Sequence, residues 1–140
     1  MADVPALTAL SSQLGYPTRA DDLAQRLSRF LSRPDDHVIL AALDDVSRVI
    51  GWIHVGRRES LETRPRAEIL GLVVDGAFRR AGVGRALMSA AEEWAVARGF
   101  DEVILRSNVV RPESHPFYES IGYARVKTQH VYTKAVSART

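Results

Sequence analysis

The strongest constraint on the fold comes from residues 67–105, where two strand-like runs flank a helical pattern. Residues 67–74 and 103–105 are short apolar runs of the kind that form buried strands. Between them apolar residues recur at the period of a helix, and Gly99 marks its end. The residues of this helical stripe are Val83, Leu87, Ala91 and Trp94. A strand, a helix and a second strand of this size place the strands side by side in parallel with a right-handed crossover, so the sequence predicts a mixed α/β fold.

The same two patterns recur on both sides of this segment. Further helices are expected at residues 4–14, 23–31 and 112–121. Further strands are expected at residues 37–43, 47–56 and 123–135. The first two of these strands should form a hairpin around Asp44, and the last run is a single strand or a strand pair. No repeat or linker divides the chain, so we expect one domain over residues 1–140.

Length and composition exclude several classes of protein. The chain has 140 residues, 46% of them hydrophobic and 26% charged, which is typical of a globular protein with one core. The absence of cysteine excludes disulfides, thiolate metal sites and a cysteinyl acyl-enzyme intermediate. A net charge of +2 gives no sign of a nucleic-acid or membrane partner. The first residues lack the pattern of a signal peptide, so we expect a cytoplasmic protein.

The turn from the strand at residues 67–74 into the following helix carries the chemistry. The unpaired N–H groups and positive end of a helix at this point favour an anion beyond the strand tip. Gly82 and Gly84 lack a Cβ and let a phosphate approach the backbone. Positive charge comes from Arg79, Arg80 and Arg85. A dinucleotide fingerprint and a Walker loop need residues that are absent here, so the pattern predicts another kind of phosphate-binding turn or an ordinary helix start.

Three ordered motifs resemble those of one enzyme superfamily. Residues 79–84, Arg-Arg-Ala-Gly-Val-Gly, match the Arg/Gln-x-x-Gly-x-Gly/Ala signature of the GCN5-related N-acetyltransferase (GNAT) superfamily, and residues 72–74 stand where its fourth strand stands. Asn108 and the run 117–123, Phe-Tyr-Glu-Ser-Ile-Gly-Tyr, resemble its later motifs. The resemblance implies a GNAT fold, with a mixed central sheet, splayed parallel strands and flanking helices. Relatives usually begin with a strand, whereas the helical spacing here starts at Val4, so either the sheet is one edge strand short or the natural chain starts further upstream.

The resemblance implies acetyl-CoA as the cosubstrate and no metal. Its diphosphate would lie on the backbone amides of residues 80–85 and its pantetheine along residues 72–74, where Gly71 is consistent with a bulge. Asn108 would hydrogen-bond the pantetheine amides, but it also fits a turn and stands further from the next motif than in many relatives. The implied cofactor-binding residues are Leu72, Val73, Val74, Arg79, Arg80, Ala81, Gly82, Val83, Gly84, Arg85 and Asn108.

Acetyl transfer to an amine needs a base for the amine and an acid for the departing thiolate. Tyr118 matches the family's tyrosine near the coenzyme sulfur and is assigned as the general acid, the alternative being a packed aromatic residue. Glu68 is the candidate base, acting directly or through a water, and its parity predicts the face of the even-numbered residues 70–74. The alternative for Glu68 is an ion pair with Arg66 or another arginine. His54 is a second candidate base, because an imidazole titrates in the right range.

The predicted function is direct transfer of the acetyl group of acetyl-CoA to a primary amine of a small molecule in a ternary complex. Direct transfer is favoured because no cysteine is present to carry the acetyl group. The alternative is a catalytically silent module that binds acyl-CoA or regulates. The expected partners are the small-molecule amine and, through an exposed sheet edge, a second copy of the chain, with no nucleic acid and no membrane. Residues 57–85 carry a net charge of +3, which fits the phosphates of a coenzyme.

Overall fold

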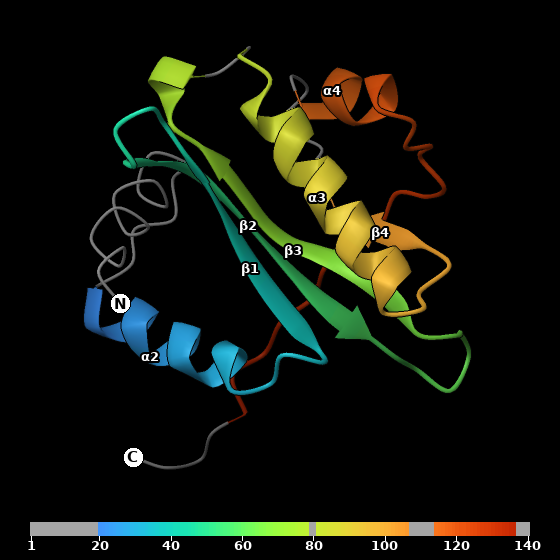
Figure 1. Cartoon of the computed structure of the whole chain (residues 1–140). Helices are drawn as coiled ribbons and strands as arrows, with labels where there is room; N and C mark the ends of the chain where they lie inside the picture. The colour runs from blue at the N-terminus through green and yellow to red at the C-terminus, as the bar shows by residue number, and fades with distance from the viewer. Residues whose placement is uncertain (1–19, 79–80, 107–113, 137–140) are drawn as a thin grey trace. The chain divides into compact units, whose positions relative to one another are not determined.

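A computed structural model of the chain describes residues 20–78, 81–106 and 114–136 (Figure 1). The chain divides into two compact units, residues 1–106 and 107–140. The prediction of one domain over the whole chain stays a prediction. The helix expected at residues 4–14, and with it the question of a missing first strand, lies outside the described residues.

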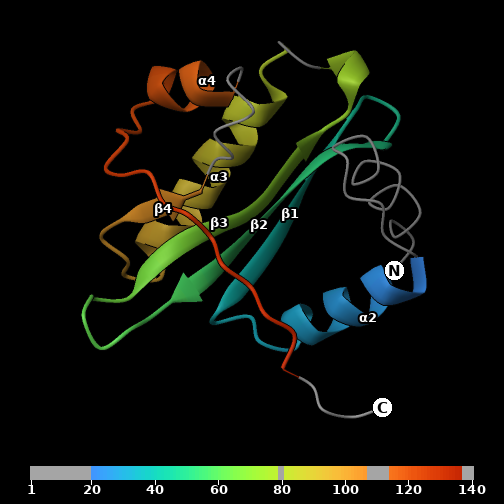
Figure 2. The same ribbon diagram turned by 180° about the vertical axis from the view of Figure 1, so that it is seen from behind.

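In the described part of the first unit, four strands form one sheet. They are β1 (His37–Leu43), β2 (Val49–Arg58), β3 (Arg66–Val74) and β4 (Val103–Leu105). The strands lie side by side in that order, as Figure 2 shows from behind. β1 and β2 are antiparallel, β2 and β3 are antiparallel, and β3 and β4 are parallel. The predicted hairpin and the predicted parallel pair are therefore confirmed.

Two helices cover opposite faces of this sheet. α2 (Ala20–Leu31) packs on an apolar cluster that includes Trp52 of β2. α3 (Val83–Ala97) packs on Gly51, where a Cβ would come within 3.2 Å of the Leu87 side chain. Neighbouring residues of a strand point to opposite faces, so Gly51 and Trp52 place the two helices on opposite sides. The largest fully buried side chains of the core are Ile53, Val55 and Met88.

α3 ends at Ala97, and Gly99, the residue predicted to stop it, follows the C-cap residue Arg98. Gly99 has a φ of +84°, in the left-handed region that glycine adopts without strain. Its N–H donates to the carbonyl of Val96 at 3.0 Å, and the N–H of Phe100 donates to the carbonyl of Ala95 at 2.9 Å. This pair of bonds satisfies the last carbonyls of the helix and fixes the turn into β4.

β3 contains a bulge at Leu70, one residue before the glycine at which a bulge was expected. The register pairs His54 with Gly71 and then Val55 with Ile69, so Leu70 is skipped. The bulge lets β3 bend past the point where β4 ends.

The bulge also reverses the alternation of side chains between the two halves of β3. Glu68 pairs with Gly56 of β2, whereas Leu72 pairs with Ile53. Positions 53 and 56 of one strand point to opposite faces. Leu70 lies on the face of Glu68, since a Cβ on Gly56 would come within 2.7 Å of its side chain. Glu68 therefore lies on the α2 face and Leu72 on the α3 face. The prediction that Glu68 shares a face with Leu70 is confirmed, and the prediction that it shares a face with Leu72 and Val74 was wrong.

The second unit contains α4 (Ser114–Ser120), and the turn after it has Gly122 at a φ of +99°. The strand or strand pair expected at residues 123–135 is wrong, because residues 123–136 form neither helix nor strand. Val131 and Tyr132 are 85% and 89% exposed. Their composition favours a strand, but a strand also needs a partner for its backbone groups, and no strand pairing in the described residues includes this segment. Among the described helices, none is both long and apolar enough to cross a membrane.

Candidate functional site

Asp75 shapes the turn that follows β3. Its Oδ1 accepts a hydrogen bond from the backbone N–H of Ala77 at 2.9 Å, and its carbonyl accepts one from the N–H of Phe78 at 2.9 Å. Its own N–H donates to the carbonyl of Ile50 on β2 at 2.8 Å. These bonds hold the 3-10 helix η1 (Gly76–Phe78) directly after the end of β3.

Gly82 begins α3 in a backbone conformation that other residues adopt only with strain. Its φ is +84°, in the left-handed region, and no side chain of the described residues caps the helix. A Cβ on Gly82 would meet no described atom within 4 Å. The N–H of Ala86 donates to the carbonyl of Gly82 at 3.0 Å. The N–H groups of residues 83–85 precede this bond and have no partner within the helix.

An anion is the ligand that such a turn can hold. The N-terminus of this 15-residue helix carries a partial positive charge beside its N–H donors. Ala81, Gly82 and Arg85 are exposed, and the guanidinium adds a full charge. The turn therefore fits the predicted diphosphate, whose binding stays a prediction. The predicted site residues that lie outside the described residues are Arg79, Arg80 and Asn108.

The edge of β3 that would carry the pantetheine is open on the side of β4. β4 pairs with residues 67–69 of β3, and the described residues provide no strand partner on that side for residues 70–74. Leu72 and Val74 are half-buried on the α3 face, and Val73 is buried on the α2 face. This edge agrees with the splayed parallel strands of the predicted fold, and its backbone groups can pair with an extended ligand.

Glu68 is almost buried, and arginines hold both of its oxygens. Nη1 of Arg58 donates to Oε1 at 3.1 Å, and Nε of Arg106 donates to Oε2 at 3.1 Å. The Glu68 side chain is 10% exposed, whereas those of Arg58 and Arg106 are 42% and 48% exposed. The ion pair named as the alternative for Glu68 is therefore present, with these two arginines as partners. The role of Glu68 as a base stays a prediction.

His54 lies on the same face but belongs to an aromatic cluster under α2. Its Nε2 lies 3.1 Å from Nδ1 of His37, whose Nε2 lies 3.1 Å from the guanidinium of Arg33. Phe30 packs on both imidazoles, with ring centroids 4.5 Å from His37 and 4.4 Å from His54. Burial, and secondarily the charge of His37, lowers the pKa of His54 to about 4. His54 is therefore neutral at pH 7, and its contacts favour a structural role over that of a base.

In the second unit, Tyr118 lies half-buried on α4. Its ring meets those of Phe117 and Tyr123 edge-on, with centroids 5.2 Å and 6.4 Å away. The N–H of Tyr123 donates to the carbonyl of Tyr118 at 3.0 Å, which fixes the end of the helix. The aromatic packing agrees with the alternative of a packed residue, and the general-acid assignment stays a prediction.

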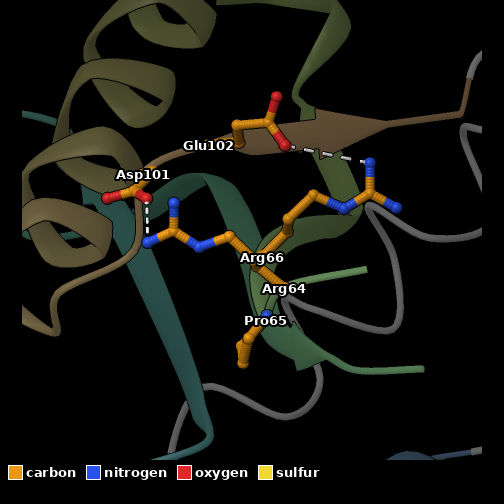
Figure 3. A pocket seen from close by; sticks show the side chains of 5 residues that line it. All are labelled: Arg64, Pro65, Arg66, Asp101 and Glu102. Atoms are coloured by element: carbon orange, nitrogen blue, oxygen red, sulfur yellow. Dashed lines mark ion pairs between the residues drawn. The ribbon is translucent and has the colours of Figure 1, made fainter. Parts of the chain in front are cut away.

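A pocket of about 310 Å³ lies at the start of the parallel pair (Figure 3). Its lining residues are Arg64, Pro65, Arg66, Asp101 and Glu102. Arg64 pairs with Asp101, and Nη1 of Arg66 lies 4.0 Å from Oε1 of Glu102. β3 and β4 are parallel, so the segments that precede them meet at the N-terminal ends of the two strands. The turn at Gly82 follows the opposite, C-terminal end of β3. This pocket is therefore separate from the anion-binding turn.

Sequence analysis missed three residues of the site. Asp75 carries a recognisable signal, since an aspartate followed by a glycine at a strand end is typical of a turn. Arg58 and Arg106 carry no local signal, because their convergence on Glu68 depends on the strand register. Among the described residues, no group of three or more His, Cys, Asp or Glu side chains is arranged to hold a metal ion.

Comparisons with known proteins agree with the fold. The model of the acetyltransferase (GNAT) family matches residues 4–123. N-acetylaspartate synthetase of Homo sapiens is 28% identical over 111 residues, which cover 79% of this chain and 35% of that protein. Aminoglycoside N(6')-acetyltransferase type 1 of Stenotrophomonas maltophilia is 29% identical over 126 residues, which cover 87% of this chain and 80% of that protein. The chain thus spans about a third of the length of the N-acetylaspartate synthetase that it matches.

A solved structure shows the same fold. AAC(6')-Iy in complex with the bisubstrate analog CoA-S-monomethyl-acetylneamine superposes with a TM-score of 0.85 at 19% identity, over 96% of this chain and 93% of that one. The superposition agrees with the mixed sheet and flanking helices described above. Because the family model covers most of the sequence, the chain belongs to the acetyltransferase (GNAT) family.

Proposed function

We propose that this chain transfers the acetyl group of acetyl-CoA directly to a primary amine of a small molecule, with both substrates bound at once. The observation that carries the proposal is the start of α3, where Gly82 has a φ of +84° and no described atom lies within 4 Å of the place of a Cβ. Such a turn admits a diphosphate to the backbone N–H groups at the positive end of a helix. Membership of the GNAT family supports acetyl-CoA as the donor.

The described residues proposed to bind the coenzyme belong to the first unit. The N–H groups of residues 83–85 and the guanidinium of Arg85 would hold the diphosphate. The open edge of β3 at residues 70–74 would pair with the pantetheine amides. When bound, acetyl-CoA supplies an acetyl group that is already activated as a thioester. Further contacts are proposed for Arg79, Arg80 and Asn108.

The proposed reaction needs proton transfers at both the nitrogen and the sulfur. The ammonium form of the acceptor must first lose a proton, because only the neutral amine can attack. Its nitrogen then bonds to the acetyl carbon, the carbon–sulfur bond breaks, and the nitrogen loses a second proton as it becomes an amide. Glu68, directly or through a water, is the proposed acceptor of the first proton, and the burial and low pKa of His54 make it the weaker candidate. The hydroxyl of Tyr118 is proposed to give a proton to the departing sulfur, and the second proton that the nitrogen loses on becoming an amide returns to Tyr118 through solvent.

A small-molecule acceptor is supported by the names of the relatives. One of them is named for N-acetylaspartate and another for the acetylation of aminoglycosides. Both names refer to small molecules that carry the acetyl group on nitrogen. The two acceptors differ in charge, so the charge around the site indicates which kind of acceptor this chain prefers.

Binding and turnover, measured together, test the proposal. Calorimetric titration with acetyl-CoA should show binding, and release of CoA should be detected with at least one amine from a panel of polyamines, aminoglycosides, amino acids and peptide N-termini. Binding of acetyl-CoA with no turnover on any amine would instead support the alternative, a catalytically silent acyl-CoA-binding module. Absence of binding would contradict both. A cytoplasmic location and a homodimer stay predictions.

A further inference from the structure

Three charged residues of the first unit form a cluster with an excess of positive charge, here called the arginine clamp. The clamp consists of Arg58 at the end of β2, Glu68 on β3 and Arg106 directly after β4. Its two guanidiniums and one carboxylate leave one positive charge in excess. The Glu68 side chain is only 10% exposed, against 42% and 48% for the two arginines. A ligand that approaches the clamp therefore meets the guanidiniums first.

Glu68 holds both guanidiniums in place before any ligand binds. Its two oxygens each accept one arginine N–H, at 3.1 Å from Arg58 and 3.1 Å from Arg106. A guanidinium presents its N–H donors in one plane, in a geometry that matches two oxygens of a carboxylate or a phosphate. A side chain that is already ordered loses little entropy on binding. The clamp is therefore prepared for an anionic oxygen group.

The clamp lies at the fork where β4 leaves β3. The last pair of the two strands is Ile69 with Leu105, so Glu68 stands one residue before the fork and Arg106 one residue after it. In the proposed function, the pantetheine follows residues 70–74 toward this fork. The reacting acetyl group would then lie next to the clamp.

We propose that the arginine clamp binds an anionic oxygen group, a carboxylate or a phosphate, on the amine that accepts the acetyl group. This inference rests on the proposed function and names its substrate class. The acceptor is an amine that also carries negative charge, and a polycation is disfavoured by the excess positive charge of the clamp. A purely structural role would need the same two ion pairs but would give no preference among amines.

The test compares amines that differ in charge, at saturating acetyl-CoA. O-phosphoethanolamine and ethanolamine differ only by the phosphate, L-aspartate carries two carboxylates, and neamine is a polycation. The variants are Arg58→Gln and Arg106→Gln, with Arg48→Gln as the control. Arg48 is an exposed arginine whose Nε pairs with Asp44 at 2.9 Å in the β1–β2 turn. Thermal unfolding checks that each variant is folded.

The wild-type chain should prefer O-phosphoethanolamine or L-aspartate to ethanolamine and neamine, and the preferred one of the two identifies phosphate or carboxylate. Arg58→Gln and Arg106→Gln should each lower kcat/KM for that amine roughly 10- to 100-fold, mainly through KM, since a charged hydrogen bond is lost. The loss for ethanolamine, which has no anionic group for the clamp to hold, should be much smaller, and Arg48→Gln should change neither value. A wild-type preference for neamine, which needs no variant, would overturn the inference. So would an equal loss for ethanolamine and the anionic amine.

If the chain acetylates no amine, the proposed function fails, and the clamp is tested by binding alone. The arginine Nε–H signals are followed by NMR during titration of the acetyl-CoA-loaded chain with O-phosphoethanolamine and with L-aspartate. The signals of Arg58 and Arg106 should shift, and Arg48→Gln should leave these shifts intact. If the Nε–H signals of Arg58 and Arg106 do not shift, the inference is overturned, whether or not the proposed function holds.

Discussion

Gly82 and Gly99 flank α3 with the same backbone geometry and give a matched pair of substitutions. Both have a φ of +84°, and a Cβ on either would meet no described atom within 4 Å. An alanine at either position is therefore strained but not crowded. Each substitution should cost about 1–2 kcal/mol, the energy of placing an L-residue in the left-handed region. In a domain of this size, that cost lowers Tm by roughly 3–8 °C.

The two substitutions should differ in their effect on acetyl-CoA. A Cβ on Gly82 would stand beside the N–H groups of residues 83–85 and keep the diphosphate from the backbone. We expect Gly82→Ala to raise Kd at least about tenfold, or about 1.4 kcal/mol, whereas Gly99→Ala leaves Kd unchanged. Gly82→Asn separates strain from access, because asparagine tolerates the left-handed region but carries a Cβ. It should be more stable than Gly82→Ala and still bind acetyl-CoA weakly.

Circular dichroism during heating measures the loss of stability, and calorimetric titration at a temperature where all variants are folded measures Kd. The two alanine variants should unfold at similar temperatures and differ only in Kd. Equal Kd values for Gly82→Ala and the wild type would refute the assignment of this turn to the diphosphate.

Three further predictions concern the acid, the packing of β3 and the histidine cluster. Tyr118→Phe should lower kcat far more than it raises KM, because a proton donor acts only in the transition state; an unaltered kcat in steady-state assays would leave Tyr118 as a packed aromatic residue. Gly71→Ala should destabilise the fold by roughly 1–3 kcal/mol through overpacking, because its Cβ would come within 2.8 Å of the Trp52 ring; an unchanged midpoint of urea denaturation would contradict this. The free energy of unfolding should fall as the pH drops from 6.5 toward about 4. Burial is the main cause that lowers the pKa values of His54 and His37 in the folded chain. The unfolded chain therefore takes up protons on both histidines in a pH range where the folded chain does not, which favours unfolding. His54→Gln should reduce this slope, and equal slopes in urea titrations at several pH values would argue against it.

Most of the fold of the first unit was predictable from periodicity. β1 and β4 have the bounds that their apolar runs indicated, and α3 lies in the stretch of helical spacing that Gly99 ends. α3 buries one stripe, and β1 and β4 are short apolar runs, so the pattern of apolar residues records their type and extent. Residues 123–136 were not predictable in this way, because a strand also requires a partner, which local composition does not record.

The site was predictable where a single residue type carries the geometry. Gly82 stands directly before α3, where the sequence indicated a glycine turn into a helix, and its φ is +84°. The face of Glu68 was not predictable, because one skipped residue, Leu70, moves the rest of β3 to the opposite face. The arginines that converge on Glu68, one from β2 and one from directly after β4, could not be named from sequence either, because their meeting depends on the strand register.

A crystal structure of this chain with acetyl-CoA tests the central claim most directly. The diphosphate should lie on the N–H groups of residues 83–85, with Gly82 still in the left-handed region and the pantetheine along the edge of β3 at residues 70–74. A diphosphate bound instead in the pocket lined by Arg64 and Arg66, at the opposite end of the parallel strands, would contradict the account.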